Sequence, residues 1–233
     1  MSKLFQEKHD SLYVIIIAIF CTLIVATNEI GTKIFSIPLS DIALPCGIIT
    51  YPAVFAITDI VSEVWGPKKA KLMVILGFFA SVLNLIIIQI CVYLPPHSNW
   101  VTPDNPFAYQ SPSDYQTAFL SVFSQNHMMI LASMLAYLAG QMTDIKLFHY
   151  LKVLCNNKHL WIRNNLSTFT AQLIDTIIFS TIFFYLALGM EISTVIQMAA
   201  HYYGFKLMIA ILDTPFVYLG VYGIKQLKQK KSA

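Results

Sequence analysis

Residues 72–94 contain no charged side chain, and they form one of six long apolar segments in this chain. A transmembrane helix needs roughly 20 apolar residues to cross about 30 Å of hydrocarbon. The segments lie at about 11–30, 45–65, 70–94, 125–145, 166–188 and 197–224. Hydrophobic residues make up 57% of the chain and charged residues 12%, which is about half the charged share of a soluble domain. The sequence therefore predicts an all-α membrane protein with six transmembrane helices, forming one domain over residues 1–233.

The basic residues predict which side of the membrane each connection occupies. Of the 15 Lys and Arg residues, 13 flank the segments on one side, while Lys33 lies in an opposite-side loop and Lys206 lies inside the sixth segment. The 13 are Lys3, Lys8, Lys68, Lys69, Lys71, Lys146, Lys152, Lys158, Arg163, Lys225, Lys228, Lys230 and Lys231. Cytoplasmic loops carry the excess of basic residues, so both termini are expected in the cytoplasm. The apolar run after Lys8 is expected to be the first transmembrane helix, because no small-x-small cleavage site follows it.

Two stretches depart from plain helices. Pro45, Gly47 and Pro52 interrupt the second segment and predict a kinked, partly unwound entry, which is tolerated in a membrane only where protein or a cavity covers the freed carbonyls. The outer loop at about 95–124 contains five prolines, yet residues 115–123 have apolar side chains at helical spacing. A short amphipathic helix is expected there, on the outer surface or over the bundle.

Asp59, Asp175, Lys206 and Asp213 all lie well inside the apolar segments. On insertion scales each such charge costs about 2.5–3.5 kcal/mol near the bilayer centre, so pairing, hydration or a bound polar ligand must offset the cost. Helical spacing also gives four segments one polar face each, and lipid cannot satisfy such faces. We therefore expect one inward-facing polar site, centred on Asp59, Gln172, Asp175 and Lys206.

Simpler explanations exist for several of these residues. Lys206 and one aspartate can form a purely structural ion pair. Glu63 lies close in sequence to Lys68 and Lys69, which favours an ordinary carboxylate at the membrane edge.

Other classes of protein find little support. The chain lacks a His-Glu-x-x-His pair, a Gly-x-Ser-x-Gly elbow and a glycine-rich phosphate loop, so we expect no enzyme, no cofactor and no metal site. No channel filter sequence is visible. The net charge of +3 is spread along membrane edges, which argues against nucleic acid as a partner. Cys21, Cys46, Cys91 and Cys155 have no paired spacing and are expected in the core or at interfaces.

Several blocks of sequence resemble the queuosine precursor transporter family. The segment GIITYPAVFAITDIVSEVWG at 47–66 is similar to the signature of that family's second helix, and Asn28 also fits. Three more blocks match in order along nearly the whole chain, without the first ten residues and the outer loop. They are AYLAGQMTD at 136–144, RNNLST at 163–168 continuing to QLIDT at 172–176, and Lys206 with DTPFVY at 213–218.

The resemblance implies import of 7-deazaguanine bases, the precursors of the tRNA nucleoside queuosine, and a six-helix fold like the substrate-binding components of vitamin uptake systems. The partners would be a small heterocyclic base and the lipid bilayer of the cell (inner) membrane. The site residues would be Asn28, Tyr51, Phe55, Asp59, Gln141, Gln172, Asp175, Tyr202, Lys206 and Asp213.

The chemistry of the base suits these residue types. Asp175 or Asp59 would accept from its donor edge, Gln172 and Gln141 would orient the ring, and Lys206 would balance the carboxylates. Tyr51, Phe55 and Tyr202 would stack on the flat base. The residues leave open which base is carried, the energy source, the oligomeric state and a separate energising partner. They also leave open another flat heterocycle or vitamin, and a non-transporting scaffold.

Overall fold

The computed structural model describes residues 2–31, 33–36, 43–100, 109, 111–124 and 127–229. Four residues used in the sequence analysis lie outside these ranges, namely Pro103, Pro106, Lys230 and Lys231.

Each of the six apolar segments corresponds to a helix. The helices are α1 (Ser2–Ile30), α2 (Tyr51–Trp65), α3 (Pro67–Tyr93), α5 (His127–Leu154), α6 (Leu160–Phe179) and α7 (Ile192–Gln229). The expected amphipathic helix is also present in the outer loop, as α4 (Pro112–Phe123). Ser111 caps α4, because its hydroxyl accepts a hydrogen bond from the Asp114 N–H at 3.2 Å.

Four stretches are long and apolar enough to cross a membrane among the residues that the structure describes. They are Ser11–Ile30, Pro67–Tyr93, Leu160–Ala187 and Ile192–Gln226. Helix α2 has 15 residues, which rise about 22 Å. Helix α5 has 28 residues and contains the polar residues Gln141, Asp144 and Lys146. The chain is thus a helical, multi-pass membrane protein.

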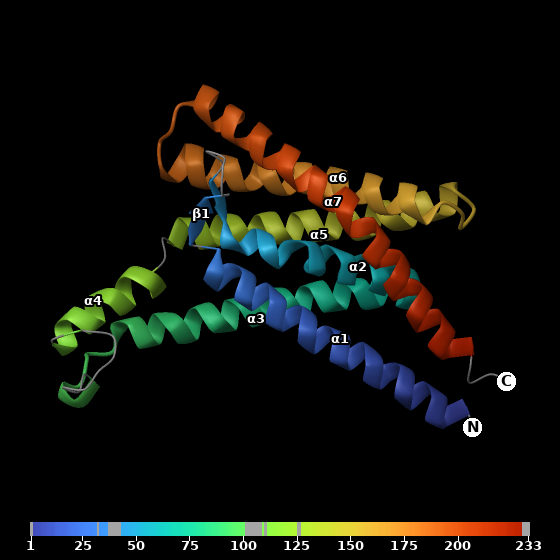
Figure 1. The fold of residues 1–233 in the computed structure, drawn as a ribbon, viewed down its shortest axis with the longest axis horizontal. Helices are drawn as coiled ribbons and strands as arrows, with labels where there is room; N and C mark the ends of the chain where they lie inside the picture. The colour runs from blue at the N-terminus through green and yellow to red at the C-terminus, as the bar shows by residue number, and fades with distance from the viewer. Residues whose placement is uncertain are drawn as a thin grey trace.

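The chain reverses direction between successive long helices (Figure 1). Helices α1, α3 and α6 run from right to left in that view, and α2, α5 and α7 run back. Both termini lie at the right-hand end, where α2 meets α3 and α5 meets α6.

The entry to α2 is irregular, as Pro45, Gly47 and Pro52 predict. Residues Cys46–Ile49 form the 3-10 helix η1, and α2 begins at Tyr51 with Pro52 in its first turn. The all-α prediction missed a small hairpin before it, in which β1 (Ile34–Ser36) pairs antiparallel with β2 (Ala43–Pro45). Where the chain enters the bundle, pairing within the hairpin supplies hydrogen-bond partners for the backbone N–H and C=O groups. The Cys46 N–H also donates to the Lys33 carbonyl at 2.8 Å.

The fifth segment also changes geometry, which the sequence did not predict. Helix α6 ends at Phe179 and continues as the π-helix η3 (Ser180–Ala187). The polar face of α6 does not continue beyond Ser180, because the rest of η3 is almost entirely apolar.

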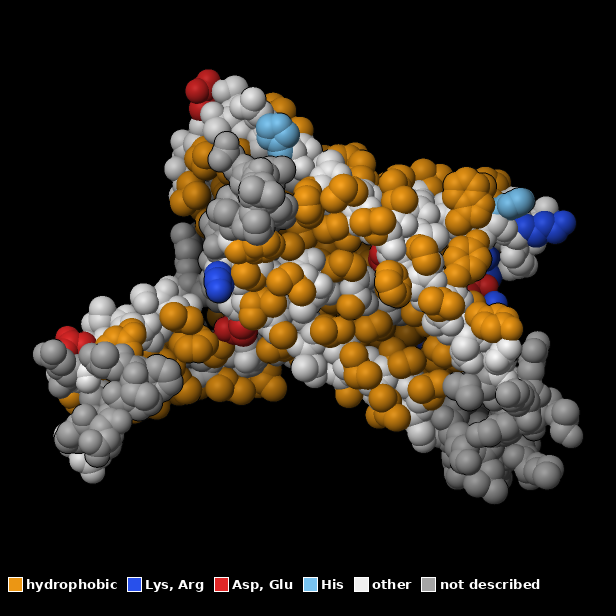
Figure 2. Space-filling view, in the orientation of Figure 1, with side chains coloured by type: hydrophobic (Ala, Val, Ile, Leu, Met, Phe, Trp, Pro, Cys, Tyr) orange, Lys and Arg blue, Asp and Glu red, His pale blue; other side chains and the backbone are white. Residues whose placement is uncertain are grey.

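The buried core joins α1, α2, α3 and α5, and apolar side chains cover the outside of the bundle. Phe20, Val61 and Met73 are fully buried in this core. In Figure 2, hydrophobic side chains dominate the face between the two ends of the bundle, and most of the charged groups that are visible lie near its ends. This distribution suits a lipid environment, in which the apolar side chains face outward.

Two glycines allow close helix contacts. A Cβ atom at Gly77 of α3 would lie 2.8 Å from the Phe20 ring and 2.9 Å from the Tyr137 hydroxyl. A Cβ atom at Gly140 of α5 would lie 3.2 Å from Cβ of Asp175 and 3.3 Å from the Ala171 carbonyl. Small residues of this kind bring membrane helices together, and Gly140 holds α5 against the polar face of α6.

Candidate functional site

Polar side chains from four helices meet inside the bundle, and one face of α6 organises them. Eight buried residues repeat on that face at helical spacing, and all of them are polar or small. They are Arg163, Asn164, Ser167, Thr168, Ala171, Gln172, Asp175 and Thr176. Three groups of contacts follow along this face.

The first group, here named the lysine cluster, consists of Tyr51, Gln172, Asp175 and Lys206. Lys206 Nζ forms an ion pair with Asp175 Oδ2 and donates to the Tyr51 hydroxyl at 3.2 Å. The Tyr51 hydroxyl in turn donates to Gln172 Oε1 at 2.7 Å, and it lies 3.2 Å from Asp175 Oδ2. Lys206 is 3% exposed and Gln172 is 2% exposed, so the contacts form away from solvent.

Aromatic rings surround the lysine cluster. Lys206 Nζ lies 4.8 Å from the centre of the Tyr51 ring and 4.6 Å from that of Tyr202, within cation–π range. The Phe55 ring packs one turn along α2, with its centre 5.0 Å from that of Tyr51. The cluster therefore combines a carboxylate, an ammonium group, an amide and flat apolar surfaces, which is the set of groups that binds a planar polar molecule.

The second group, here named the acid cluster, consists of Asp59 on α2, Asp144 on α5 and Asp213 on α7. Asp213 lies close enough to Asp59 and Asp144 for their charges to interact. The Thr168 hydroxyl of α6 lies 3.5 Å from Asp59 Oδ2 and 3.4 Å from Asp144 Oδ1. Asp59, Asp144 and Asp213 are buried, and none forms an ion pair within the described part of the chain.

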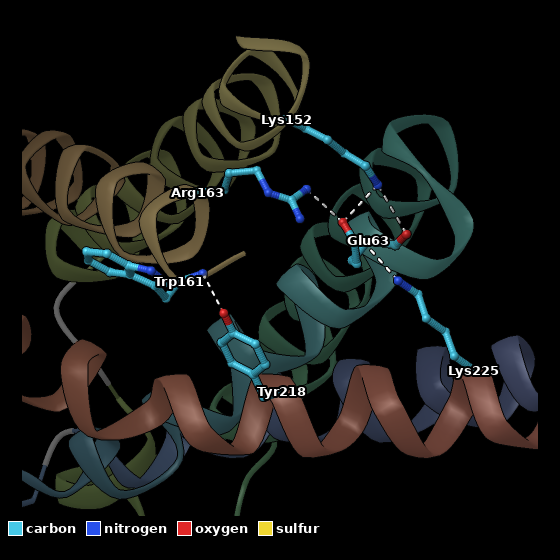
Figure 3. Close-up of polar contacts among 6 residues, drawn as sticks. All are labelled: Glu63, Lys152, Trp161, Arg163, Tyr218 and Lys225. Carbon is cyan, nitrogen blue, oxygen red and sulfur yellow. Dashed lines mark hydrogen bonds and ion pairs between the residues drawn. The ribbon is translucent and has the colours of Figure 1, made fainter. Parts of the chain in front are cut away.

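The third group, here named the glutamate cluster, lies at the end of the bundle that holds both termini. Glu63 of α2 accepts from Lys152 at 2.8 Å, from Arg163 at 2.9 Å and from Lys225 at 3.1 Å (Figure 3). These cations come from α5, α6 and α7, so one carboxylate ties four helices together. The partners of Glu63 come from distant helices rather than from Lys68 and Lys69, which are near it in sequence.

The structure thus divides the single site that the sequence predicted. Gln172, Asp175 and Lys206 meet, but Asp59 contacts Thr168, which precedes Asp175 by two helical turns, or about 10 Å of rise. Asp213 lies with Asp59 rather than with Lys206. Tyr202 lies beside Lys206, and Phe55 packs against Tyr51.

Asn28 and Gln141 occupy other positions. Asn28 of α1 donates to Ser81 of α3 at 3.3 Å and accepts from Ser133 of α5 at 3.5 Å. Gln141 is fully buried, and neither of its amide atoms has a hydrogen-bond partner among the described residues. It follows Gly140, which contacts Asp175, and precedes Asp144 by one turn, so it lies between the lysine and acid clusters.

The sequence analysis counted Arg163 among the basic residues of a loop and did not include it among the site residues. The structure places it on α6 with 2% exposure, over the Phe148 ring and paired with Glu63. The signal was present in the spacing, because Arg163 and Ser167 precede Asp175 by multiples of four residues and so extend its polar face.

Comparison with known proteins places this arrangement in a family. A family model described as "Putative vitamin uptake transporter" matches residues 45–220, which include the lysine and acid clusters. A protein of Bacillus subtilis (strain 168) named "Probable queuosine precursor transporter" is 25% identical over 185 residues, covering 78% of this chain and 74% of that protein. No solved structure matches the chain. Since the family model covers well over half of the sequence, this multi-pass membrane protein belongs to the vitamin uptake transporter family.

Proposed function

We propose that this protein imports queuosine precursors, the 7-deazaguanine bases or queuine, across the cell membrane for salvage into tRNA. The observation that carries the proposal is the lysine cluster, where Asp175, Gln172 and Lys206 meet beside aromatic rings. The proposal is further supported by the name of the Bacillus subtilis relative, a probable queuosine precursor transporter.

The chemistry of a 7-deazaguanine matches the lysine cluster group by group. One edge of the base carries ring N–H and exocyclic amine donors, which a carboxylate accepts in bidentate fashion. The adjacent carbonyl accepts from an ammonium or amide group. Asp175, rather than Asp59, is the proposed acceptor, because Gln172 and Lys206 lie beside Asp175. The Tyr51, Phe55 and Tyr202 rings supply stacking surfaces for the flat base.

The proposed topology has six transmembrane helices with both termini in the cytoplasm. Three features support it: the alternating direction of the long helices, the shared end of the two termini, and the concentration of basic residues at that end. The glutamate cluster would then lie at the cytoplasmic end, and the α2 entry and α4 at the outer end.

The test is uptake of labelled 7-cyano-7-deazaguanine by cells that lack both their own importer and synthesis of the base. Expression should produce uptake, and an excess of unlabelled 7-aminomethyl-7-deazaguanine or queuine should compete. A Glu191→Gln variant, altered at an exposed residue, should behave like wild type. A normally abundant protein that gives no uptake would refute the proposal. Uptake of a different heterocycle or vitamin would then point to another substrate of this family, and no uptake of any solute would point to a scaffold.

A further inference from the structure

We propose that the acid cluster of Asp59, Asp144 and Asp213 is a proton-binding site, and that proton binding there is coupled to movement of the base. The coupling part rests on the proposed function. The substrate would bind at the lysine cluster, and the proton would bind nearer the end of the bundle that holds the termini.

Asp59 and Asp144 share one buried partner, the Thr168 hydroxyl. That hydroxyl lies 3.5 Å from Asp59 Oδ2 and 3.4 Å from Asp144 Oδ1, and its one hydrogen can be donated to only one of them. Asp59 is 1% exposed and Asp144 is 0% exposed, so solvent does not separate their charges. Two carboxyl groups that share a buried site hold a proton between them because both cannot ionise at once.

The surrounding cations do not replace that proton. Lys206 is paired with Asp175 on one side of the acid cluster, and Arg163 is paired with Glu63 on the other. Other charged and titratable groups on the packed helices include Lys69 over Tyr13 on α3 and α1, His149 and Lys152 on α5, and Lys225 on α7. A divalent metal is also disfavoured, since no three His, Cys, Asp or Glu side chains are arranged to hold one in the described ranges.

A second observation indicates a bound species at this site. Gln141, fully buried, leaves both amide atoms without partners, while Asp59 Oδ1 and Asp144 Oδ2 also lack partners within the described residues. Gln141 precedes Asp144 by three residues on α5, and helical side chains lean toward the N-terminus, so the Asp144 side chain leans toward Gln141. Buried amide and carboxylate atoms that lack partners mark a position for water or an ion.

The position of Gln141 also suggests how the two clusters communicate. Its neighbour Gly140 contacts Asp175 of the lysine cluster, and Asp144 lies one turn further along the same helix. Loss of the shared proton would leave like charges on α2, α5 and α7, which repel and disfavour the close packing of these helices. Proton binding therefore favours one arrangement of the helices, and a base that prefers the same arrangement becomes linked to the proton.

The first experiment measures the proton without any substrate. Infrared difference spectra of the purified protein near neutral pH should contain a protonated-carboxyl band that is absent from Asp59→Asn and from Asp144→Asn. Glu191→Gln should retain the band. Absence of the band from wild type, or its persistence in both aspartate variants, would overturn the proton site whatever the protein transports. If either variant is not monodisperse, Asp213→Asn takes its place, and a weakened or shifted band is expected.

The second experiment measures coupling in proteoliposomes with labelled 7-cyano-7-deazaguanine. An inward proton gradient of one pH unit should drive up to about tenfold accumulation if one proton accompanies each base. Asp144→Asn should lose this accumulation but still exchange labelled for unlabelled base, whereas Glu191→Gln should do both. Exchange by wild type that no proton gradient can drive, or that a sodium gradient drives instead, would overturn coupling and leave the proposed function intact. Absence of exchange by the wild-type protein would count against the proposed function and against the coupling that rests on it. The proton site would then be tested by the infrared measurement alone.

Discussion

Replacing Asp175 by Asn isolates the ion pair at the centre of the lysine cluster. Asn has nearly the same shape as Asp but carries no charge, so Lys206 would keep the Tyr51 hydroxyl at 3.2 Å and lose its carboxylate partner. The Lys206 side chain is 3% exposed, so water cannot take the place of that partner.

The expected loss of stability follows from this burial. Removing one member of a buried ion pair costs about 3–5 kcal/mol, because the other charge remains buried without compensation. For a chain of roughly 150–250 residues, that corresponds to a fall in Tm of about 6–20 °C. Removing both charges in Asp175→Asn with Lys206→Met should recover most of the loss, since no uncompensated charge remains.

The assay combines thermal stability of the purified protein in detergent with uptake of the labelled base. Asp175→Asn should be the least stable variant, the double variant should approach wild type, and exposed Glu191→Gln should match wild type. A single variant as stable as wild type would refute the buried ion pair.

Uptake by the double variant then tests the binding role of Asp175. Loss of the acceptor should lower affinity for the base about ten- to hundred-fold, from about 1–3 kcal/mol for unsatisfied buried donors. A stable double variant that transports with wild-type affinity would show that the pair is purely structural.

Three further predictions concern topology, the glutamate cluster and helix packing. Reporter fusions at the C-terminus and in the loop between α3 and α4 should report opposite sides of the membrane, and the same side for both would contradict the six-span topology. Glu63→Gln should lower the free energy of unfolding by about 3–5 kcal/mol in thermal unfolding, because it leaves Arg163 unpaired at 2% exposure. Lys225→Gln should lower it by less than about 1 kcal/mol, because Lys225 is half exposed. Equal losses of stability in the two variants would contradict this view of the cluster. Gly140→Leu should cost about 1–3 kcal/mol of stability by the same measurement and reduce uptake, since even its Cβ would lie 3.2 Å from Cβ of Asp175. Gly204→Leu should be tolerated, because the space around Gly204 is open. The reverse order of stabilities would refute the close α5–α6 contact.

Much of the helical architecture follows from local properties of the sequence. Apolar segments of sufficient length predict helices, and the prolines at 45 and 52 predict the irregular entry that the structure has as η1 and the start of α2. Helical spacing correctly placed Gln172 and Asp175 on one face. These features depend on residues within a few turns of each other, so the sequence determines them without knowledge of the packing.

The sequence by itself determined which segments form long apolar helices and which of their faces are polar; only the tertiary structure decided which polar faces meet. Spacing along α6 could not show that Asp175 pairs with Lys206 while Thr168 contacts Asp59 and Asp144. Nor could it show that Glu63 pairs with Lys225, 162 residues away, rather than with the nearby lysines. The physical reason is that the vertical offset and rotation of each helix come from packing contacts such as Gly140 against Asp175, and a shift of two turns moves a carboxylate from one cluster to the next.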